Sequence, residues 1–319
     1  MKTVAITGCS GYIGSRLLEQ VAGEGFAERV IGIDIRNQGH RFENLHFYKM
    51  DVRDKRIFDV FSVYKPHSVV HLAFVVDPMR DEKLMHDINV SGTRNVLKAA
   101  LYCGARHITI ASSTSAFGAF PDNPSYLKET DQPRRQPNFA YASDKYEVEM
   151  MLKIFKRENP KVGLAVIRPC IVYGPNVNNY LSSFLLDFPI LPGVGGARPP
   201  MQFIHEDDVA RFFLTVLKQE PSGYFHAVGE GLVEIEEIAE MAQKRIVDVP
   251  PFLLYPLVDA LWKLRAPRIN GPSGMLEFIR YRWTCSDELT RKALDIPPHM
   301  SSKEVVRVTL ESKGALKKK

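Results

Sequence analysis

A tyrosine and a lysine separated by one helical turn are the residues of this chain best suited to move a proton. Tyr141 and Lys145 lie in the run Tyr-Ala-Ser-Asp-Lys, and residues four apart share one face of a helix. An ammonium beside a phenol favours the phenolate, so we expect Lys145 to lower the pKa of Tyr141 from about 10 toward neutrality. Tyr141 would then shuttle a proton to or from an alcohol or ketone, and Ser113 could donate a hydrogen bond to the same oxygen. Lys145 could also hold a ribose hydroxyl of a cofactor.

This pair is not diagnostic alone, because tyrosine and lysine are common on solvent-exposed helix faces. The pair becomes informative in combination with the stretch Thr-Gly-Cys-Ser-Gly-Tyr-Ile-Gly at residues 7–14. This stretch joins an apolar run to an amphipathic run. Gly8 lets the chain turn off a strand, Gly11 lets a phosphate approach the main chain, and Gly14 lets a helix pack closely on the sheet. The N–H groups of the first helical turn would then suit a pyrophosphate.

A second apolar run, residues 30–33, ends in Asp34, twenty residues after Gly14. In a strand-helix-strand unit this carboxylate lies at the end of the second strand, where it can accept both hydroxyls of an adenosine ribose. It would repel a 2′-phosphate, which favours NAD over NADP. Arg36 leaves the NADP alternative open, because its side chain could pair with a 2′-phosphate.

Strands and helices alternate through the first half of the chain, which predicts an α/β fold with a doubly wound parallel (Rossmann) sheet. The strand at 67–74 is apolar almost throughout, as expected for a strand buried on both faces. The predicted strands are 4–6, 30–33, 46–50, 67–74, 105–115 and 163–167, and the predicted helices are 12–21, 55–64, 82–103 and 141–158.

Beyond Arg168 the alternation stops, and prolines and glycines crowd residues 169–200. We expect residues 1–168 to form the dinucleotide-binding domain with the Tyr141 helix. Residues 169–312 would mainly form a smaller C-terminal substrate lobe, with some segments returning to the first domain, and residues 313–319 a basic tail. Helical patterns return at 207–218, at 234–247 and near the C terminus. The apolar segment 249–264 favours a buried helix over a cover for a lipid-like substrate.

Composition excludes several classes of function. The 319 residues are 45% apolar and 25% charged, and the net charge of +5 lies largely in the lysine-rich tail. No basic stripe with interleaved aromatic residues indicates nucleic-acid binding, and no segment is long and apolar enough to be an integral membrane span. The four cysteines are scattered without metal-ligand spacing, so we expect no metal site and reduced thiols in the cytoplasm.

These motifs together resemble those of the extended short-chain dehydrogenases/reductases, the NAD-dependent epimerase/dehydratase superfamily. The resemblance covers about the first two thirds of the chain. It rests on the glycine pattern at 7–14, Asp34, Asp-Val-Arg-Asp at 51–54, His-Leu-Ala at 71–73, Asn-Val-x-Gly-Thr at 89–93, Ser112-Ser113, Tyr141-x-x-x-Lys145, Arg168-Pro169 and Phe-Ile-His-x-Asp-Asp-Val-Ala at 203–210.

The resemblance implies NAD as cofactor, a small-molecule substrate and a homodimer. The homodimer would form through the helices that hold Asn89 and Tyr141. His71 and His205 would be structural. The implied cofactor-binding residues are Gly8, Gly11, Tyr12, Ile13 and Gly14 in the glycine turn, Asp34 at the ribose, Asp51 and Val52 at the adenine, Leu72 and Ala73 along the cofactor path, Tyr141 and Lys145 at the reacting end, and Pro169 beside the nicotinamide.

Two departures from the superfamily pattern bear on the substrate. The 4,6-dehydratases carry an Asp-Glu pair where this chain has Thr114 and Ser115, which weakens that reading and favours epimerases. Many sugar-nucleotide enzymes carry an asparagine where Ile171 stands, and an isoleucine cannot donate a hydrogen bond to a diphosphate. That substitution instead resembles relatives that act on steroids and other apolar alcohols.

Three functions therefore stay open. The first is NAD-dependent hydride transfer at a secondary alcohol carbon, with epimerisation of a sugar nucleotide if the ketone stays bound and takes hydride back on its other face. The second is a dehydrogenase of a steroid-like or other hydrophobic alcohol. The third is a non-catalytic NAD(P) sensor, which retention of Ser113, Tyr141 and Lys145 disfavours. Residues 176–180 could serve sugar hydroxyls.

Overall fold

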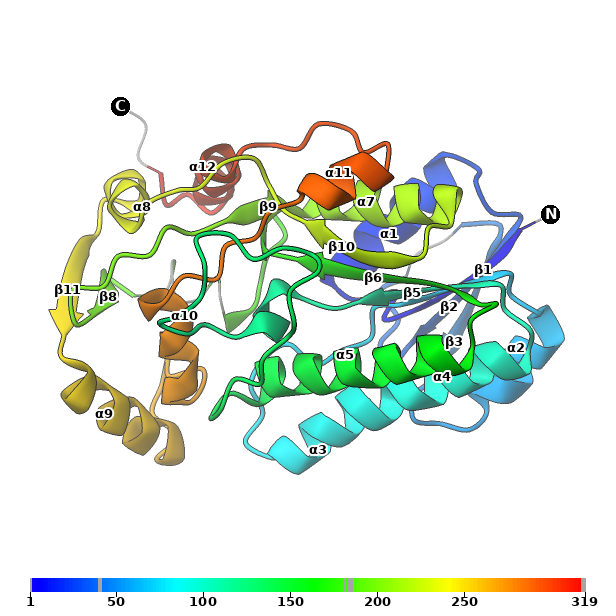
Figure 1. Ribbon diagram of the computed structural model, residues 1–319, viewed down its shortest axis with the longest axis horizontal. Coiled ribbons are helices and arrows are strands. Elements are labelled where there is room, and N and C mark those ends of the chain that lie inside the picture. The colour runs from blue at the N-terminus through cyan, green and yellow to red at the C-terminus, as the bar shows by residue number, and fades with distance from the viewer. Residues whose placement is uncertain (1, 40–41, 181, 183–185, 187, 317–319) are drawn as a thin grey trace.

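Seven parallel strands form the central sheet of the computed structural model, which describes residues 2–39, 42–180, 182, 186 and 188–316 (Figure 1). The strands lie in the order β10-β6-β5-β4-β1-β2-β3. Chain order reverses between β1 and β4, as in a doubly wound fold, and such a switch point is where these sheets bind ligands. The strands are β1 (Thr3–Thr7), β2 (Arg29–Asp34), β3 (Leu45–Lys49), β4 (Ser68–His71), β5 (His107–Ala111), β6 (Gly163–Pro169) and β10 (Gly223–Ala227).

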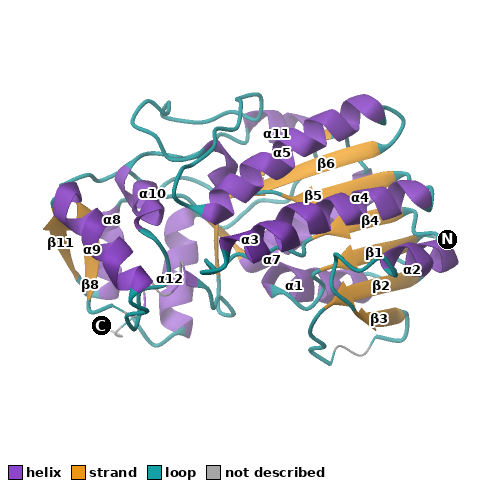
Figure 2. Cartoon of the chain, turned by 90° about the horizontal axis from the view of Figure 1, so that it is seen from below, coloured by secondary structure: helices purple, strands orange, loops and turns teal. Residues whose placement is uncertain are grey.

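Helices cover both faces of this sheet, so apolar side chains on each face are removed from water. One layer consists of α1 (Tyr12–Gly23) and α7 (Glu206–Gln219), and the other of α2 (Ile57–Tyr64), α4 (Gly92–Tyr102) and α5 (Ala140–Glu158) (Figures 1 and 2). The predicted α/β doubly wound fold is therefore confirmed.

The C-terminal part adds two small parallel sheets and several helices, most of them at the end of the molecule opposite the N terminus (Figure 2). Strand β7 (Ile171–Tyr173) pairs with β9 (Phe203–His205), and β8 (Ile190–Val194) pairs with β11 (Arg245–Val249). The remaining helices are α8 (Ile235–Ala242), α9 (Pro251–Lys263), α10 (Glu277–Arg280), α11 (Glu288–Ala293) and α12 (Ser302–Ser312). Strand β10 pairs with β6, so the chain returns to the central sheet after β9.

The structure corrects several predicted element boundaries. The predicted helix 234–247 is wrong beyond residue 242, because Gln243 adopts a left-handed conformation and residues 245–249 form a strand instead. Strands predicted at 67–74 and 105–115 end earlier, at residues 71 and 111. The helix predicted at 82–103 is α3 (Glu82–His86) and α4 with the π-helical turn Asp87–Ser91 between them.

The apolar segment 249–264 forms α9, but the prediction that this helix is buried is wrong. Leu254 is its one buried residue. The helix lies at the lower edge of the C-terminal part in Figure 1 and in front of β8 and β11 in Figure 2. The predicted basic tail 313–319 lies in part outside the described residues, since 317–319 are among those not described.

Candidate functional site

The glycine turn after β1 packs so closely on neighbouring backbone that two of its glycines leave no room for a side chain. Gly8 has a φ of +73°, and a Cβ there would lie 2.4 Å from the backbone nitrogen of Ala73. A Cβ on Gly14 would lie 2.1 Å from the carbonyl oxygen of Gly8. The glycine turn therefore packs between the first turn of α1 and the backbone that follows β4, at the switch point of the sheet.

Asp34, at the end of β2, is joined to this turn. Its carboxylate accepts hydrogen bonds from the backbone N–H of Ser10 at 3.0 Å and of Arg36 at 3.0 Å. Asp34 and Arg36 line the same cavity as the glycine turn. The structure thus brings the predicted ribose-binding carboxylate and the predicted pyrophosphate-binding turn together.

Asp34→Asn is expected to weaken NAD binding by about ten- to a hundredfold, since a hydrogen bond to a charged group contributes about 1.5–3 kcal/mol. It should also remove the repulsion of a 2′-phosphate, so the preference for NAD over NADP should fall. Isothermal titration with both dinucleotides measures this ratio, with Arg36→Gln as the control expected to leave NAD affinity little changed. An unchanged NAD-to-NADP ratio in Asp34→Asn would contradict this role.

The predicted adenine-binding pair also lies in this cavity. Asp51 and Val52 line it, and the Asp51 carboxylate pairs with the Arg53 guanidinium at 2.7 Å. Hydrogen bonds from Arg53 hold the pKa of Asp51 below its ordinary value. Asp51 therefore stays ionised and fixed in place at this end of the cavity.

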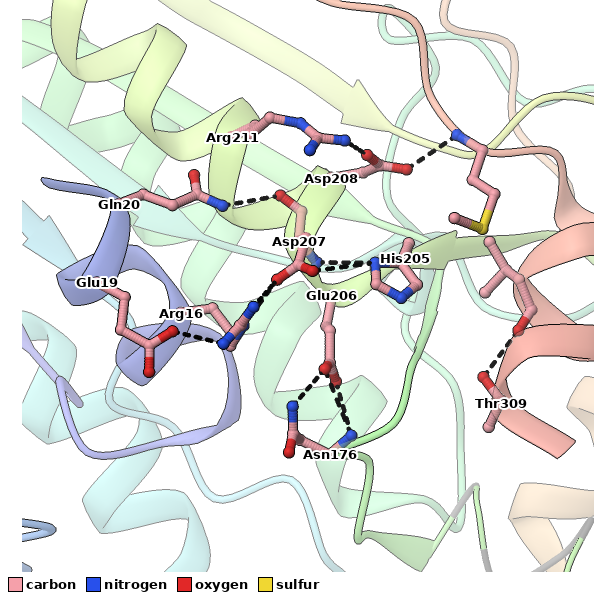
Figure 3. A network of polar contacts seen from close by, with 12 residues as sticks. Arg16, Glu19, Gln20, Asn176, His205, Glu206, Asp207, Asp208, Arg211 and Thr309 are labelled. Carbon is pink, nitrogen blue, oxygen red and sulfur yellow. Dashed lines mark hydrogen bonds and ion pairs between the residues drawn. The ribbon is translucent and has the colours of Figure 1, made fainter. Parts of the chain in front are cut away.

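A polar network fastens α1 to α7 (Figure 3). Arg16 of α1 pairs with the Asp207 carboxylate at 2.5 Å, and the Gln20 side chain donates to the Asp207 carbonyl oxygen at 3.2 Å. The neighbouring Glu206 accepts a hydrogen bond of 2.6 Å from the amide of Asn176. The helix that carries the glycine turn is thus held against the segment that follows β7.

The three predicted catalytic residues meet at the ends of β5 and α5. Ser113 and Tyr141 line the cavity, and Lys145 lies one turn along α5 with its nitrogen 5.7 Å from the centre of the Tyr141 ring. The Lys145 ammonium donates to the carbonyl oxygen of Ala111 at 2.7 Å and lies 3.4 Å from the centre of the Phe74 ring. The helical spacing puts Tyr141 and Lys145 on one face of α5, and the fold places Ser113 on the lining of the same cavity.

The prediction that Lys145 lowers the pKa of Tyr141 is wrong in this arrangement. Burial raises the pKa of Tyr141 above its ordinary value, and hydrogen bonding with Ser113 and Ser115 acts in the opposite direction. The phenol is therefore protonated at neutral pH, which is the form that gives a proton to a carbonyl oxygen. Phe74 packs edge-on against the Tyr141 ring, with ring centres 5.8 Å apart, and contributes to this desolvation.

Burial lowers the pKa of Lys145 from 10.5 to about 7, and the carboxylates of Glu149 and Asp144 partly oppose that shift. An exposed lysine in the unfolded chain keeps a pKa of about 10.4. Between these values the unfolded chain binds one more proton than the folded protein, so this lysine makes the free energy of unfolding rise with pH.

Lys145→Met is expected to remove this rise. The free energy of unfolding of the native sequence, measured with denaturant from pH 7 to pH 10, should increase relative to that of the variant. The comparison cancels titration of groups common to both proteins. Parallel curves for the two proteins across this window would contradict a folded-state pKa of about 7.

A buried ion pair, which the sequence motifs did not reveal, lies next to the catalytic residues. Arg168 of β6 and Glu149 of α5 lie 2.6 Å apart, and their side chains are 1% and 0% exposed. The Ser112 hydroxyl donates to the same carboxylate at 2.6 Å. Glu149 lies one helical turn beyond Lys145, so the sequence spacing could have placed it on the same helix face as the catalytic residues. Its partner Arg168 is distant in sequence and is identified by the fold.

A second support comes from Asn89 in the π-helical turn. Its side chain donates to the carboxylate of Asp144 at 2.9 Å and accepts from the backbone N–H of Val75 at 2.7 Å. Asp144 lies beside Lys145, and Val75 lines the cavity.

His71 was predicted to be structural. Its ring hydrogen-bonds with the hydroxyls of Thr7 at 2.7 Å and Thr93 at 2.9 Å.

The glycine turn, Asp34 and the three catalytic residues line one cavity of about 530 Å³. The glycine turn, Asp34 and Asp51 line one part of it. A second set of side chains, which we call the apolar wall, comes from the segment after β4, from the N-cap of α5, from β7 and from the C-terminal part. The apolar wall comprises Val75, Val76, Phe139, Ile171, Met201, Met275, Leu276, Phe278, Ile279 and Trp283.

Aromatic rings connect the apolar wall to the catalytic tyrosine. The ring centre of Phe139 is 5.8 Å from that of Tyr141 and 5.6 Å from that of Phe278, which in turn is 4.9 Å from Trp283. Among the described residues that line the cavity, Arg36 and Lys145 are the cationic ones. Neither belongs to the apolar wall, so that wall supplies no positive charge for a diphosphate.

The remaining predicted site residues line this cavity too, and so does part of the polar segment 176–180. Asn178, Asn179 and Tyr180 contribute to the lining, whereas Asn176 pairs with Glu206 outside it. The other predicted residues on the lining are Tyr12, Ile13, Leu72, Ala73 and Pro169. Within the described ranges, no group of three or more His, Cys, Asp or Glu residues could hold a metal ion.

The residues at the switch point fit a dinucleotide, because the close-packed glycine turn, the ribose carboxylate and the catalytic residues share one cavity. Comparison with known families agrees with this fit. The family described as "NAD dependent epimerase/dehydratase family" matches residues 4–227.

Similar proteins include epimerases with different substrates. The chain is 27% identical over 268 residues to N-acetyl-alpha-D-glucosaminyl-diphospho-ditrans,octacis-undecaprenol 4-epimerase of Escherichia coli O157:H7, covering 80% of this chain and 76% of that protein. It is 28% identical over 252 residues to UDP-glucose 4-epimerase of Mycolicibacterium smegmatis, covering 73% and 78%. The crystal structure of UDP-glucose 4-epimerase from Thermus thermophilus in complex with NAD superimposes with a TM-score of 0.72 at 21% identity, covering 98% and 100%.

Proposed function

The chain belongs to the NAD-dependent epimerase/dehydratase family, and we propose that it transfers hydride at a secondary alcohol carbon of an apolar substrate. The observation that carries this proposal is the apolar wall beside Tyr141. On the described lining of the whole cavity the cations are Arg36, beside Asp34, and Lys145, beside Tyr141. A sugar nucleotide carries a diphosphate, and burying such charges without a cationic partner is costly. An apolar alcohol instead gains from contact with these side chains.

NAD, the cofactor of this family, supplies the hydride acceptor when bound. In the proposed mechanism the hydroxyl of Ser113 donates a hydrogen bond to the substrate oxygen. The phenol of Tyr141 gives its proton to the carbonyl oxygen during reduction, and the phenolate left behind takes the proton of the alcohol during oxidation. Lys145 stabilises charge beside the phenol and holds a ribose hydroxyl. The proposed cofactor contacts are those predicted from the sequence, from the glycine turn through Asp34 to Pro169.

A sugar-nucleotide epimerase is the second candidate. The names of the relatives favour it, and so do the amide side chains of Asn178 and Asn179 on the cavity lining. If the ketone stays bound and takes hydride back on its other face, the same residues catalyse epimerisation. A 4,6-dehydratase is less well supported, because Thr114 and Ser115 stand in place of its acid pair. Retention of the three catalytic residues likewise argues against a non-catalytic NAD(P) sensor.

The substrate class can be tested by supplying the protein with NAD and a panel of secondary alcohols. The panel holds steroid and terpene alcohols on one side and UDP- and TDP-hexoses on the other. We expect NADH absorbance to develop with members of the apolar set. Interconversion of a sugar nucleotide without activity on apolar alcohols would support the second candidate instead.

We further propose a cytoplasmic homodimer that pairs through α4 and α5. These helices run side by side on one face of the sheet (Figure 2), and each exposes an apolar side chain, Tyr102 on α4 and Ile154 on α5. Burying such side chains between two copies would stabilise a dimer. All four cysteines are free thiols, in keeping with the cytoplasm. No helix in the described ranges is long and apolar enough to cross a membrane.

A further inference from the structure

Helix α9 exposes several large apolar side chains to solvent. Leu253, Leu257 and Leu264 are 54%, 52% and 77% exposed, and their spacing of four and seven residues sets them along one face of the helical path. Phe252, beside them at the start of the helix, is 74% exposed. A contiguous exposed apolar face of this kind marks an interaction site in a water-soluble protein.

Positive charge accompanies this apolar face. Lys263, Arg265 and Arg268 are exposed at and just beyond the end of α9. None of the three is paired with a carboxylate in the part of the chain that the structure describes. Between residues 249 and 270 the one acidic residue is Asp259, which accepts hydrogen bonds from the N–H and hydroxyl of Ser273. The face is therefore apolar and cationic, with no free acid of its own.

The helix is also fixed to two segments of the apolar wall. Asp259 holds Ser273, which begins the short helical turn that carries the cavity-lining Met275. On the other side the Arg80 guanidinium lies 4.0 Å from the centre of the Trp262 ring and donates to the Trp262 carbonyl oxygen. Arg80 follows the segment after β4 that contributes Val75 and Val76 to the apolar wall.

We propose that α9 docks in the plane of an anionic lipid bilayer. The apolar side chains of Phe252, Leu253, Leu257 and Leu264 would enter the boundary between headgroups and acyl chains. The cations Lys263, Arg265 and Arg268 would contact anionic headgroups. At 13 residues the helix is too short to span a bilayer. Charge complementarity favours lipid over a second copy of this face, because two copies would bring their unpaired cations together.

Docking in this orientation would hold the apolar wall close to the lipid. An apolar alcohol could then pass between the bilayer and the cavity without crossing water. This part of the inference rests on the proposed function, whereas docking itself does not depend on it.

Vesicle flotation of the full-length protein tests the docking. The probes are vesicles of phosphatidylcholine alone and of an equal mixture of phosphatidylcholine and phosphatidylglycerol. We expect binding to the mixed vesicles that weakens as salt rises. Replacing Lys263, Arg265 and Arg268 together with glutamine should lower the affinity about a hundredfold, since each cation near such a surface contributes about 1 kcal/mol, or about a fivefold factor.

A second variant tests the apolar face. Leu253→Gln with Leu257→Gln should lower the affinity for mixed vesicles at least about tenfold, because both leucines lose their burial in lipid. Val63→Gln on α2 is the matched control, since Val63 is 76% exposed and far in sequence from Lys263, Arg265 and Arg268. Equal binding of the Leu253/Leu257 variant and the Val63 control would overturn the proposal, as would failure of the native sequence to bind mixed vesicles.

Two further readouts separate this inference from its alternatives. A dimer that dissociates in the Leu253/Leu257 variant without vesicles would assign the face to a second copy and overturn lipid docking. NAD-dependent turnover of a water-soluble secondary alcohol should be unchanged in that variant, because neither leucine lines the cavity. Vesicle binding without any alcohol turnover would sustain docking while contradicting the proposed function.

Discussion

Tyr141→Phe is expected to lower turnover about a hundred- to ten-thousandfold, the range typical of losing a general acid-base group. The phenol oxygen is the one group that we assign to carry the proton of the substrate, and phenylalanine keeps the ring contacts with Phe74 and Phe139 while removing that oxygen. NAD affinity should be nearly unchanged, because the glycine turn and Asp34 are untouched. Steady-state NADH formation and NAD titration measure the two effects.

Tyr146→Phe provides the control for this change. Tyr146 lies on the same helix but not on the lining of the cavity, so the substitution should leave turnover close to that of the native sequence. Native turnover in Tyr141→Phe would show that another group carries the proton. A large loss of NAD affinity would instead indicate that the tyrosine mainly holds the cofactor.

Arg168→Met is expected to lower the free energy of unfolding by about 3–5 kcal/mol, because it leaves the charge of Glu149 buried without its partner. Arg168 makes two hydrogen bonds to Glu149, at 2.8 and 2.6 Å, and a third to the carbonyl oxygen of Glu129 at 3.0 Å. Its guanidinium also lies 4.6 Å from the ring centres of Phe117 and Tyr224. Denaturant unfolding measures the change.

The double variant Arg168→Met with Glu149→Gln should recover part of this loss, because no buried charge is then left unpaired. The exposed pair Lys292–Glu288, with nitrogen and oxygen 2.6 Å apart, is the control. Lys292→Met should cost less than about 1 kcal/mol, as is usual for surface ion pairs. Equal losses for Arg168→Met and Lys292→Met would show that the buried pair contributes no more than an exposed one.

The first half of the fold could be predicted from sequence because its signals are local. The glycine turn, the acidic end of β2 and the apolar strands each depend on residues within a few positions of one another. Tyr141 and Lys145 are likewise one turn apart, so the prediction of a helix for this segment is enough to place both side chains on one face. Their convergence with Ser113 and the glycine turn then follows from the rule that ligands bind at the switch point of such a sheet.

Features that depend on distant partners could not be predicted. Residues 245–249 became a strand because β8 lies beside them, although the helical pattern of 234–247 gave no sign of it. The exposure of α9 depends on which elements pack against it. The sequence pattern of an apolar helix does not distinguish a buried helix from an exposed one. The pKa of Tyr141 rises because Phe74 and the surrounding fold exclude water, an effect that the spacing to Lys145 does not reveal.

Thermal denaturation of the NAD-loaded protein with UDP, TDP, GDP and CDP tests the central claim most directly. A ligand that binds the folded state alone stabilises it by about 2.7 kcal/mol at a hundredfold excess over its Kd, so a nucleotide site would give a clear rise in Tm. With an apolar wall that offers no cation to a diphosphate, we expect NAD to raise the Tm and none of the four nucleotides to raise it further. A clear additional rise with any one of them would contradict an apolar substrate and establish a sugar-nucleotide site.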